Sequence, residues 1–377
     1  MHATLILSDT PRAERGFLGL PVGIRVALSL VQAGVTELSV YGPRARQVCE
    51  RFARDERLTI PIQLHSPEVP VELVCLEDAW VAPEHVRGLA LGEALADVDG
   101  QPVVARVRRS CVVDPQQLLD SARIASVRPA ADGAHPVLRL HRSADRVQVQ
   151  RTLFASLIKP SDGPVSRHLN RHISRTITRW VIPLGLTPNG MTVFVAITGL
   201  LGAYAASFAS PAMQLLGAAL YQLHSIIDGC DGEIARLTQR FGKHGALIDS
   251  MIDDLCNGAF FFGLSLGVAR MLGQSWPVLT GASTAIAYAG VIGLQYNAVL
   301  RTTGRGDKTK FWSAECDERS TLFGVFKALL RRDVFVLLIL IAVALGATEA
   351  AVAVFPLCAL GALVASSLRL IESKRTA

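Results

Sequence analysis

Residues 228–253 read DGCDGEIARLTQRFGKHGALIDSMID and place four aspartates at the end of one apolar segment and the start of the next. The two segments, 212–227 and 246–272, have the apolar character of membrane spans. A carboxylate inside the hydrocarbon core costs about 2.5–3.5 kcal/mol. A cluster of acids at this position therefore indicates a functional site.

The spacing of these acids places them on shared helical faces. Asp228 and Asp231 are three residues apart, while Gly245, Asp249 and Asp253 follow one another in steps of four. Two antiparallel helices would bring the two faces together, and four carboxylates would then form an all-oxygen site. Such a site favours Mg²⁺ or Mn²⁺ over zinc. No histidine or cysteine belongs to the pattern.

The chain around this stretch divides into a soluble part and a membrane part. It has 377 residues, of which 50% are hydrophobic and 19% charged, a composition that excludes intrinsic disorder and a wholly soluble enzyme. After residue 187 it predicts an all-α domain with six transmembrane helices. The predicted spans are 191–210, 212–227, 246–272, 276–300, 334–347 and 350–370.

Basic residues predict the orientation of these spans. Lysine and arginine are concentrated in 159–180, in the loop after the second span, in 301–332 and at the C-terminal tail, whereas the other connections hold almost none. Because basic loops stay on the cytosolic side, both termini and the acid cluster are expected to face the cytosol. The chain is thus expected to be a multi-pass protein of the cell (inner) membrane, with the lipid bilayer as a partner.

The segment before the first span predicts an amphipathic helix. Over 164–180, apolar residues recur at helical spacing and arginines occupy other faces. Such a helix lies on a bilayer surface, and each arginine near anionic headgroups contributes about 1 kcal/mol. A basic solvated linker is the alternative.

Residues 1–158 predict a cytosolic α/β domain of Rossmann-like type. Strand-like runs alternate with helix-like runs, which favours a mostly parallel sheet covered by helices. The predicted strands are 3–7, 37–40, 72–76 and 102–107, and the predicted helices are 22–33, 45–54, 83–91 and 115–122.

The acid-rich stretch also resembles a family signature. It matches that of the CDP-alcohol phosphotransferase (CDP-alcohol phosphatidyltransferase) family without a departure, and Thr187, Asn189 and Thr192 near the first span resemble further family positions. The matching residues are Asp228-x2-Asp231-Gly232-x2-Ala235-Arg236-x8-Gly245-x3-Asp249-x3-Asp253.

The resemblance implies a metal-dependent transfer of a substituted phosphate from a CDP-alcohol donor to an acceptor hydroxyl, with release of CMP. It implies two divalent ions, Mg²⁺ or Mn²⁺, held by Asp228, Asp231, Asp249 and Asp253, with Asp253 also as general base. It further implies CDP contacts from Asn189, Gly232, Ala235, Arg236 and Gly245. Glu233 and Asp254 lie outside the motif. An ion relay in a transporter and a non-catalytic scaffold are the other classes for such acids.

Four basic residues near the predicted cytosolic loop are candidates for the acceptor's phosphate. They are Arg301, Arg305, Lys308 and Lys310. A basic run in such a loop is also what the orientation rule alone produces.

The layout of the whole chain resembles the bifunctional inositol-1-phosphate cytidylyltransferase and di-myo-inositol-phosphate-phosphate synthases. Their first domain has a nucleotidyltransferase fold, and the run Gly19-Leu20-Pro21 with the helix after it is similar. However, residues 8–15 lack the glycines of a phosphate loop, and no lysine precedes Lys159. The resemblance thus implies a degenerate nucleotidyltransferase-like domain at 1–158, a linker at 159–190 and a phosphotransferase domain at 191–377.

Two donors remain open for the predicted transferase. The fused layout favours CDP-inositol with inositol phosphate as acceptor, whereas a phospholipid synthase would use CDP-diacylglycerol. No nucleic-acid partner is expected, and a homodimer is common in the family that the motif resembles.

Overall fold

The computed structural model divides into two compact units, Met1–Ser156 and Leu157–Ala377. The residues that it describes are 1–8, 15–97, 99, 101–110, 114–120, 126–127, 137–159, 162–241, 245–302 and 331–376.

The first unit is built on a mixed seven-stranded sheet with the order β10-β8-β9-β6-β1-β4-β5. Its strands are β1 (His2–Ile6), β4 (Glu37–Tyr41), β5 (Ile62–Leu64), β6 (Val71–Leu76), β8 (Glu93–Ala96), β9 (Pro102–Ser110) and β10 (Ser126–Val127). Four short strands form two separate pairs, β2 (Gly16–Phe17) with β3 (Leu20–Pro21), and β7 (Ala79–Val81) with β11 (Val137–Arg139).

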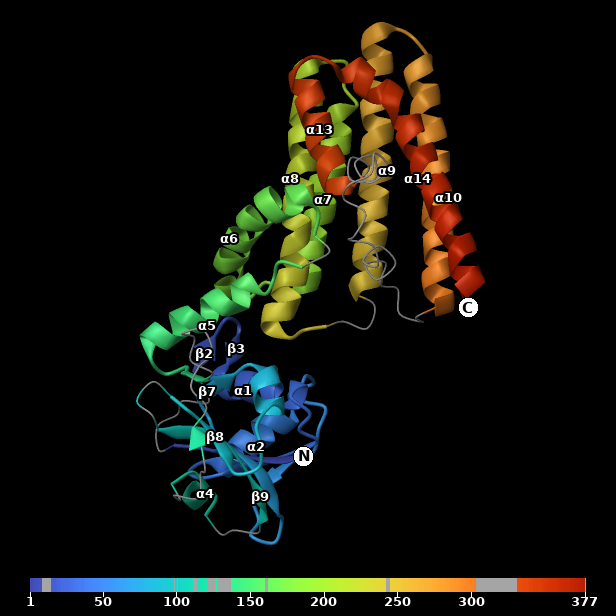
Figure 1. Cartoon of the computed structure of the whole chain (residues 1–377). Helices are drawn as coiled ribbons and strands as arrows, with labels where there is room; N and C mark the ends of the chain where they lie inside the picture. Colours follow the sequence, from blue (N-terminus) through green and yellow to red (C-terminus); the bar gives the residue numbers. More distant parts are fainter. Residues whose placement is uncertain are drawn as a thin grey trace. The chain divides into compact units, whose positions relative to one another are not determined.

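Five helices accompany the strands of this unit (Figure 1). They are α1 (Val22–Gln32), α2 (Ala45–Ala53), α3 (Pro83–Arg87), α4 (Gln116–Asp120) and α5 (Ser143–Ala155). The apolar side chains of α1 and of the central strand β1 are buried together, and they form the core of this unit. β1 runs parallel to β6, so the residues that follow the two strands meet at one edge of the sheet.

The second unit is helical, and its long helices run side by side in Figure 1. The π-helical turn η2 (Ser166–Asn170), α6 (Arg171–Val181) and the 3₁₀ turn η3 (Ile182–Leu184) come first. The long helices are α7 (Pro188–Ala206), α8 (Pro211–Thr238), α9 (Gly245–Leu272), α10 (Trp276–Thr302), α13 (Arg332–Ala344) and α14 (Thr348–Thr376).

Three stretches of these helices are long and apolar enough to cross a membrane, judged by length and composition. They are Pro188–Ala206, Leu247–Leu272 and Trp276–Leu294. Each predicted span overlaps one long helix, but 191–210 extends past the end of α7 and 334–347 past the end of α13, and among the described residues three spans are candidates. The acids of α8 and the shortness of α13 reduce the apolar stretch available to a span, and the apolar stretch described for α14 is Thr348–Gly361.

Glycines let the helices of the second unit approach one another closely. A Cβ added at Gly267 of α9 would lie 2.1 Å from the carbonyl oxygen of Ala206 on α7, and one at Gly263 would lie 2.4 Å from that of Ala203. On α8, a Cβ at Gly217 would lie 2.5 Å from the Ala206 nitrogen. Small residues at such crossings are the usual means by which membrane helices pack, and here they hold α8 and α9 against α7.

The fold confirms an N-terminal α/β part followed by a helical part, with differences in detail. The sheet is less parallel than expected, because β9 pairs antiparallel with both β6 and β8. The amphipathic segment begins with the π-helical turn η2 before α6 starts at Arg171. Hydrophobic spacing did not distinguish these arrangements, because it reports which face is buried and not how neighbouring strands run.

Candidate active site

The motif aspartates lie on α8 and α9, as the spacing predicted. The carboxyl groups of Asp231 and Asp249 lie within hydrogen-bonding reach of each other, and so do those of Asp228 and Asp253. On the α7 side, the Thr192 hydroxyl donates a hydrogen bond to Asp231 Oδ2 at 3.0 Å. The consecutive helices α7, α8 and α9 thus bring Thr192 and the four acids into one region.

An arginine and a histidine share this region. Arg332, at the start of α13, is hydrogen-bonded to Asp253 and lies 3.6 Å from Asp228 Oδ2 through Nη1. Its Nη2 donates to His224 Nε2 at 3.0 Å, and the other ring nitrogen of this fully buried histidine donates to the Val195 carbonyl at 3.0 Å. The second bond places the proton on Nδ1, so Nε2 is free to accept from the guanidinium.

The donor chemistry of this region fits a divalent cation. All four acids offer oxygen ligands, and two buried carboxylate oxygens, Asp249 Oδ1 and Asp253 Oδ1, have no hydrogen-bond partner among the described residues. Within the same residues, no three acid, histidine or cysteine side chains are already grouped to hold an ion. The guanidinium of Arg332 contacts both Asp228 and Asp253.

The small positions of the motif leave open space beside the acids. Among the described residues, a Cβ added at Gly232 or at Gly245 would meet no atom within 4 Å. Arg236 is half-buried one turn along α8 from Gly232, and its Nε has no hydrogen-bond partner within the described part of the chain. Ala235 is half-buried beside it. Open space for a ligand and the positively charged side chain of Arg236 thus lie next to the carboxylates.

Of the remaining predicted site residues, the structure describes Asn189 and the backbone of Arg301. Asn189 is exposed in the first turn of α7, which is capped by the Thr187 hydroxyl. Arg305, Lys308 and Lys310 lie outside the described residues. Arg301 belongs to the last turn of α10, where only the backbone is described. Their proposed contact with an acceptor stays a prediction.

A second charged cluster fixes α6 to α8 beside the motif. Glu233 has no exposed surface and accepts hydrogen bonds from Ser174 Oγ at 2.6 Å, Thr178 Oγ1 at 2.7 Å and Arg171 Nη1 at 3.1 Å. Arg171 also donates from Nε and Nη2 to the two oxygens of Asp162, both at 3.0 Å. Three residues of α6 therefore supply the hydrogen bonds that the buried Glu233 carboxylate needs.

This cluster changes the acidity of Asp162. Burial disfavours its charged form, but the hydrogen bonds and the charge of Arg171 outweigh burial and lower the pKa of Asp162 below its usual value. Asp162 also accepts a hydrogen bond from the Lys159 nitrogen at 2.9 Å. The carboxylate is thus stabilised in its ionised form.

Sequence reasoning missed four participants, namely His224, Glu233, Arg332 and Arg171. His224 precedes Asp228 by four residues, so its place on the same face was readable from the spacing. Glu233 was set aside because it lies outside the motif. Nothing local in the sequence linked Arg332 to Asp253, which is 79 positions away.

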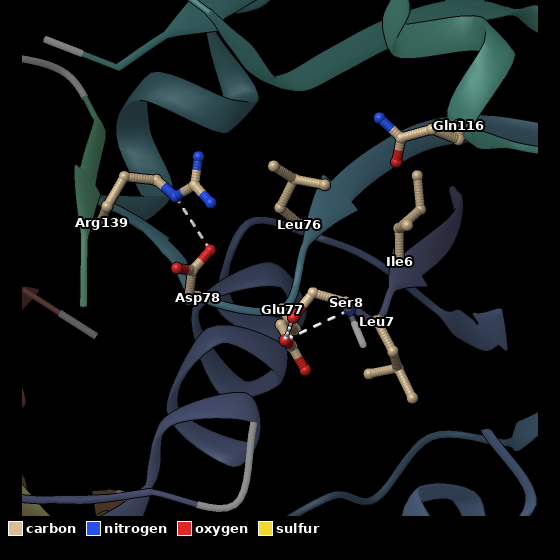
Figure 2. Close-up of a pocket in the computed structure, with 8 residues that line it drawn as sticks. All are labelled: Ile6, Leu7, Ser8, Leu76, Glu77, Asp78, Gln116 and Arg139. Atoms are coloured by element: carbon tan, nitrogen blue, oxygen red, sulfur yellow. Dashed lines mark hydrogen bonds and ion pairs between the residues drawn. The ribbon is translucent and has the colours of Figure 1, made fainter. Parts of the chain in front are cut away.

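The described pocket of the first unit lies at the edge where β1 and β6 end (Figure 2). Ser8 follows β1, and its hydroxyl and backbone nitrogen both donate to Glu77, which follows β6. In Figure 2, Asp78 and Arg139 lie at one side of the pocket, joined by a hydrogen bond of 2.9 Å. Glu77 and Asp78 are therefore both bonded to other side chains.

Asp78 is held in a buried network of charges. It is 1% exposed and is contacted by both Arg139 and His141. Arg139 also donates to Asp97 Oδ2 at 3.2 Å, and Asp97 is 5% exposed. Buried acids need such compensation, and here Arg139 contacts both Asp78 and Asp97.

Comparison with known proteins identifies the second unit. A family model for CDP-alcohol phosphatidyltransferase matches residues 185–366. The bifunctional IPC transferase and DIPP synthase of Thermococcus kodakarensis is 40% identical over 114 residues, which are 30% of this chain and 25% of that protein. The archaetidylinositol phosphate synthase of Pyrococcus horikoshii is 32% identical over 91 residues, which are 24% of this chain and 47% of the relative. The chain thus spans between a quarter and a half of these relatives' lengths.

Among solved structures, a phosphatidylinositol phosphate synthase of Mycobacterium tuberculosis, in complex with manganese and citrate, is similar with a TM-score of 0.39 and 21% sequence identity. The similarity covers 52% of this chain and 87% of that chain. The family model covers every residue of the motif from Asp228 to Asp253. The helical unit of this chain therefore carries a CDP-alcohol phosphatidyltransferase domain, a domain of transferases, over residues 185–366.

Proposed function

We propose that the chain transfers a substituted phosphate from a CDP-alcohol to an acceptor hydroxyl and releases CMP. The observation that carries this proposal is the meeting of the motif acids of α8 and α9 next to open space at Gly232 and Gly245. Family membership supplies the reaction class. A nucleotide that enters this space brings its diphosphate to the acids and to Arg236.

Each side chain has a proposed part in the reaction. Asp228, Asp231, Asp249 and Asp253 would hold two divalent ions, with Thr192 fixing the orientation of Asp231. When bound, the ions would neutralise the negative charge that develops on the diphosphate during in-line displacement. Asp253 accepts the proton of the acceptor hydroxyl, which attacks the β-phosphorus as CMP leaves. Arg236 binds the diphosphate, and the small residues Gly232, Ala235 and Gly245 admit the nucleotide.

The favoured pair of substrates is CDP-inositol and an inositol phosphate. The name archaetidylinositol phosphate synthase supports an inositol-phosphate product, and the bifunctional relatives support the fused layout from which the CDP-inositol donor is inferred. A phospholipid synthase that uses CDP-diacylglycerol is the alternative, because the motif recognises only the shared nucleotide. Arg301, Arg305, Lys308 and Lys310 remain the proposed contacts for the acceptor's phosphate.

The proposed setting is a multi-pass membrane protein with both termini and the active site on the cytosolic side. The basic residues of the linker and of the loop after α10 support this orientation. All six long helices would then cross the bilayer, and residues 1–158 would form the cytosolic domain. Residues 159–190 would connect that domain to the phosphotransferase domain.

For the first unit we propose a non-catalytic nucleotidyltransferase-like domain. The acids at its pocket are already bonded to other side chains, Glu77 to Ser8 and Asp78 to Arg139 and His141. The stretch from Ser8 to Arg15 contains no glycine. Such a domain would stabilise or regulate the transferase.

The experiment that tests the function is CMP release by the purified full chain with Mg²⁺. CDP-inositol and CDP-diacylglycerol are offered separately, each against inositol phosphate, glycerol phosphate and inositol. We expect release with CDP-inositol and inositol phosphate. Release only with CDP-diacylglycerol would establish lipid synthesis instead, and release with neither donor would contradict the proposal.

A further inference from the structure

The hydrogen bonds around Glu233 affect whether the side chain of Arg236 can bind a ligand. Both residues lie on α8 at positions i and i+3, where side chains are neighbours. An arginine so placed beside a buried carboxylate would ordinarily pair with it. Within the described residues, however, no hydrogen bond or ion pair joins Arg236 to Glu233.

The hydrogen bonds of Glu233 come instead from the linker segment. Arg171, Ser174 and Thr178 lie one turn apart on α6 and direct their donors to the two Glu233 oxygens. The acid is fully buried, so these three donors replace the water that it has lost. Its negative charge is met by Arg171 from a different helix.

Two features hold Arg171 in that position. Asp162 accepts two hydrogen bonds from the Arg171 guanidinium, and this bidentate contact fixes the plane of the guanidinium. On the other side Arg171 Nη1 approaches the Gly229 carbonyl at 3.4 Å, and a Cβ at Gly229 would lie 2.5 Å from that nitrogen. Asp162 thus fixes the orientation of the Arg171 guanidinium, and Gly229 leaves space on α8 for this arginine from α6.

We propose that Arg171 is a positioning residue that neutralises Glu233 and thereby keeps Arg236 available for the diphosphate of a CDP-containing substrate. Without Arg171, the buried carboxylate of Glu233 would take Arg236 as its counter-ion. The linker helix would then determine nucleotide affinity without touching the nucleotide. This inference rests on the proposed function of Arg236.

The test is isothermal titration of the full-length protein in detergent with CDP and Mg²⁺, since CDP is common to both candidate donors. We expect Arg171→Gln to weaken CDP binding by about tenfold or more and Glu233→Gln to stay within about threefold of wild type. The decisive variant is Arg171→Gln/Glu233→Gln, in which CDP affinity returns to within about threefold of wild type, because the charge that captures Arg236 is gone. Arg179→Gln, which removes an exposed arginine of the same helix, should bind CDP as wild type does.

A purely structural role for the cluster gives the opposite result, since the double variant would then bind CDP no better than Arg171→Gln. That result, or wild-type affinity in Arg171→Gln, overturns the inference. Should Arg171→Gln not fold, Arg171→Lys takes its place, because an ammonium cannot grip Asp162 and Glu233 together. A loss of CDP affinity in Arg171→Lys that the added Glu233→Gln substitution does not restore would then contradict the proposal. Absence of CDP binding by the wild-type protein would instead contradict the proposed function.

Discussion

Asp249 and Asp254 lie on the same helix and carry the same charge, but they contact different partners. Asp249 faces Asp231 within the acid cluster, and its Oδ1 lacks a hydrogen-bond partner among the described residues. Asp254 accepts a hydrogen bond from the Tyr288 hydroxyl at 2.9 Å. The two acids therefore form a matched pair for testing which carboxylates serve the metal.

We expect Asp249→Asn to raise the Mg²⁺ concentration needed for half-maximal CMP release by about tenfold or more, in the range seen when metal-site groups are lost. Asp254→Asn should leave this requirement within about threefold of wild type. Magnesium titrations of CMP release check both variants. An equal rise in the Mg²⁺ requirement of the two variants would contradict the assignment of Asp249, rather than Asp254, to the metal site.

The pKa of Asp162 predicts a pH dependence of stability. Its folded-state pKa lies below the usual 3.8, so its ionised form stabilises the fold at pH values above 3.8. That contribution is lost as the pH falls from about 3.8 through the lowered folded-state pKa. We expect the wild-type protein to have a higher Tm than Asp162→Asn at about pH 6, with a difference that shrinks toward about pH 3. A difference that is constant over this range would contradict the account of Arg171 and Asp162.

Sequence spacing located the acids of the site but not their neighbours. Asp228, Asp231, Asp249 and Asp253 were predictable because helical periodicity places side chains on a face without reference to the rest of the fold. Arg332 was not predictable, since its contact with Asp253 depends on where α13 packs. The capture of Glu233 by Arg171 likewise depends on a helix pairing that periodicity does not encode.

At the scale of secondary-structure elements, the packing of α7 against α9 depends on glycines. We expect Gly267→Ala to lower Tm by several degrees, because its Cβ would meet the Ala206 carbonyl oxygen at 2.1 Å and force the helices apart. Gly258→Ala on the same helix is the control, since a Cβ there would meet nothing within 4 Å and alanine is the better helix former. Thermal unfolding in one detergent compares the two. A larger loss for Gly258→Ala would contradict this packing.

The long elements were easier to predict than the short ones. The predicted spans of the membrane half overlapped α7, α8, α9 and α10, because long apolar runs leave few alternatives, although the first span extended four residues past the end of α7. In the first unit, β5 and β8 were missed, because three or four residues carry too little alternation to be distinguished from a loop. The direction of β9 also depended on its neighbours rather than on its own residues.

At the scale of the whole molecule, the two units are expected to divide structure and chemistry between them. We predict that the full chain releases no pyrophosphate from CTP and inositol 1-phosphate with Mg²⁺, because residues 8–15 lack the glycines of a phosphate loop and Asp78 is already bonded to Arg139 and His141. The same preparation should release CMP when CDP-inositol is supplied. Pyrophosphate release above the level of a protein-free control would contradict a non-catalytic first unit.

The central claim is that Asp253 removes the proton of the acceptor hydroxyl at a CDP-binding site between α8 and α9. The most direct test measures CMP release and CDP affinity together for the wild type and for Asp253→Asn. Loss of a general base lowers the rate by about 10²–10⁴-fold, so we predict that CMP release falls by at least about 100-fold while CDP affinity stays within about threefold. An Asp253→Asn protein that releases CMP at half the wild-type rate or faster would contradict the mechanism.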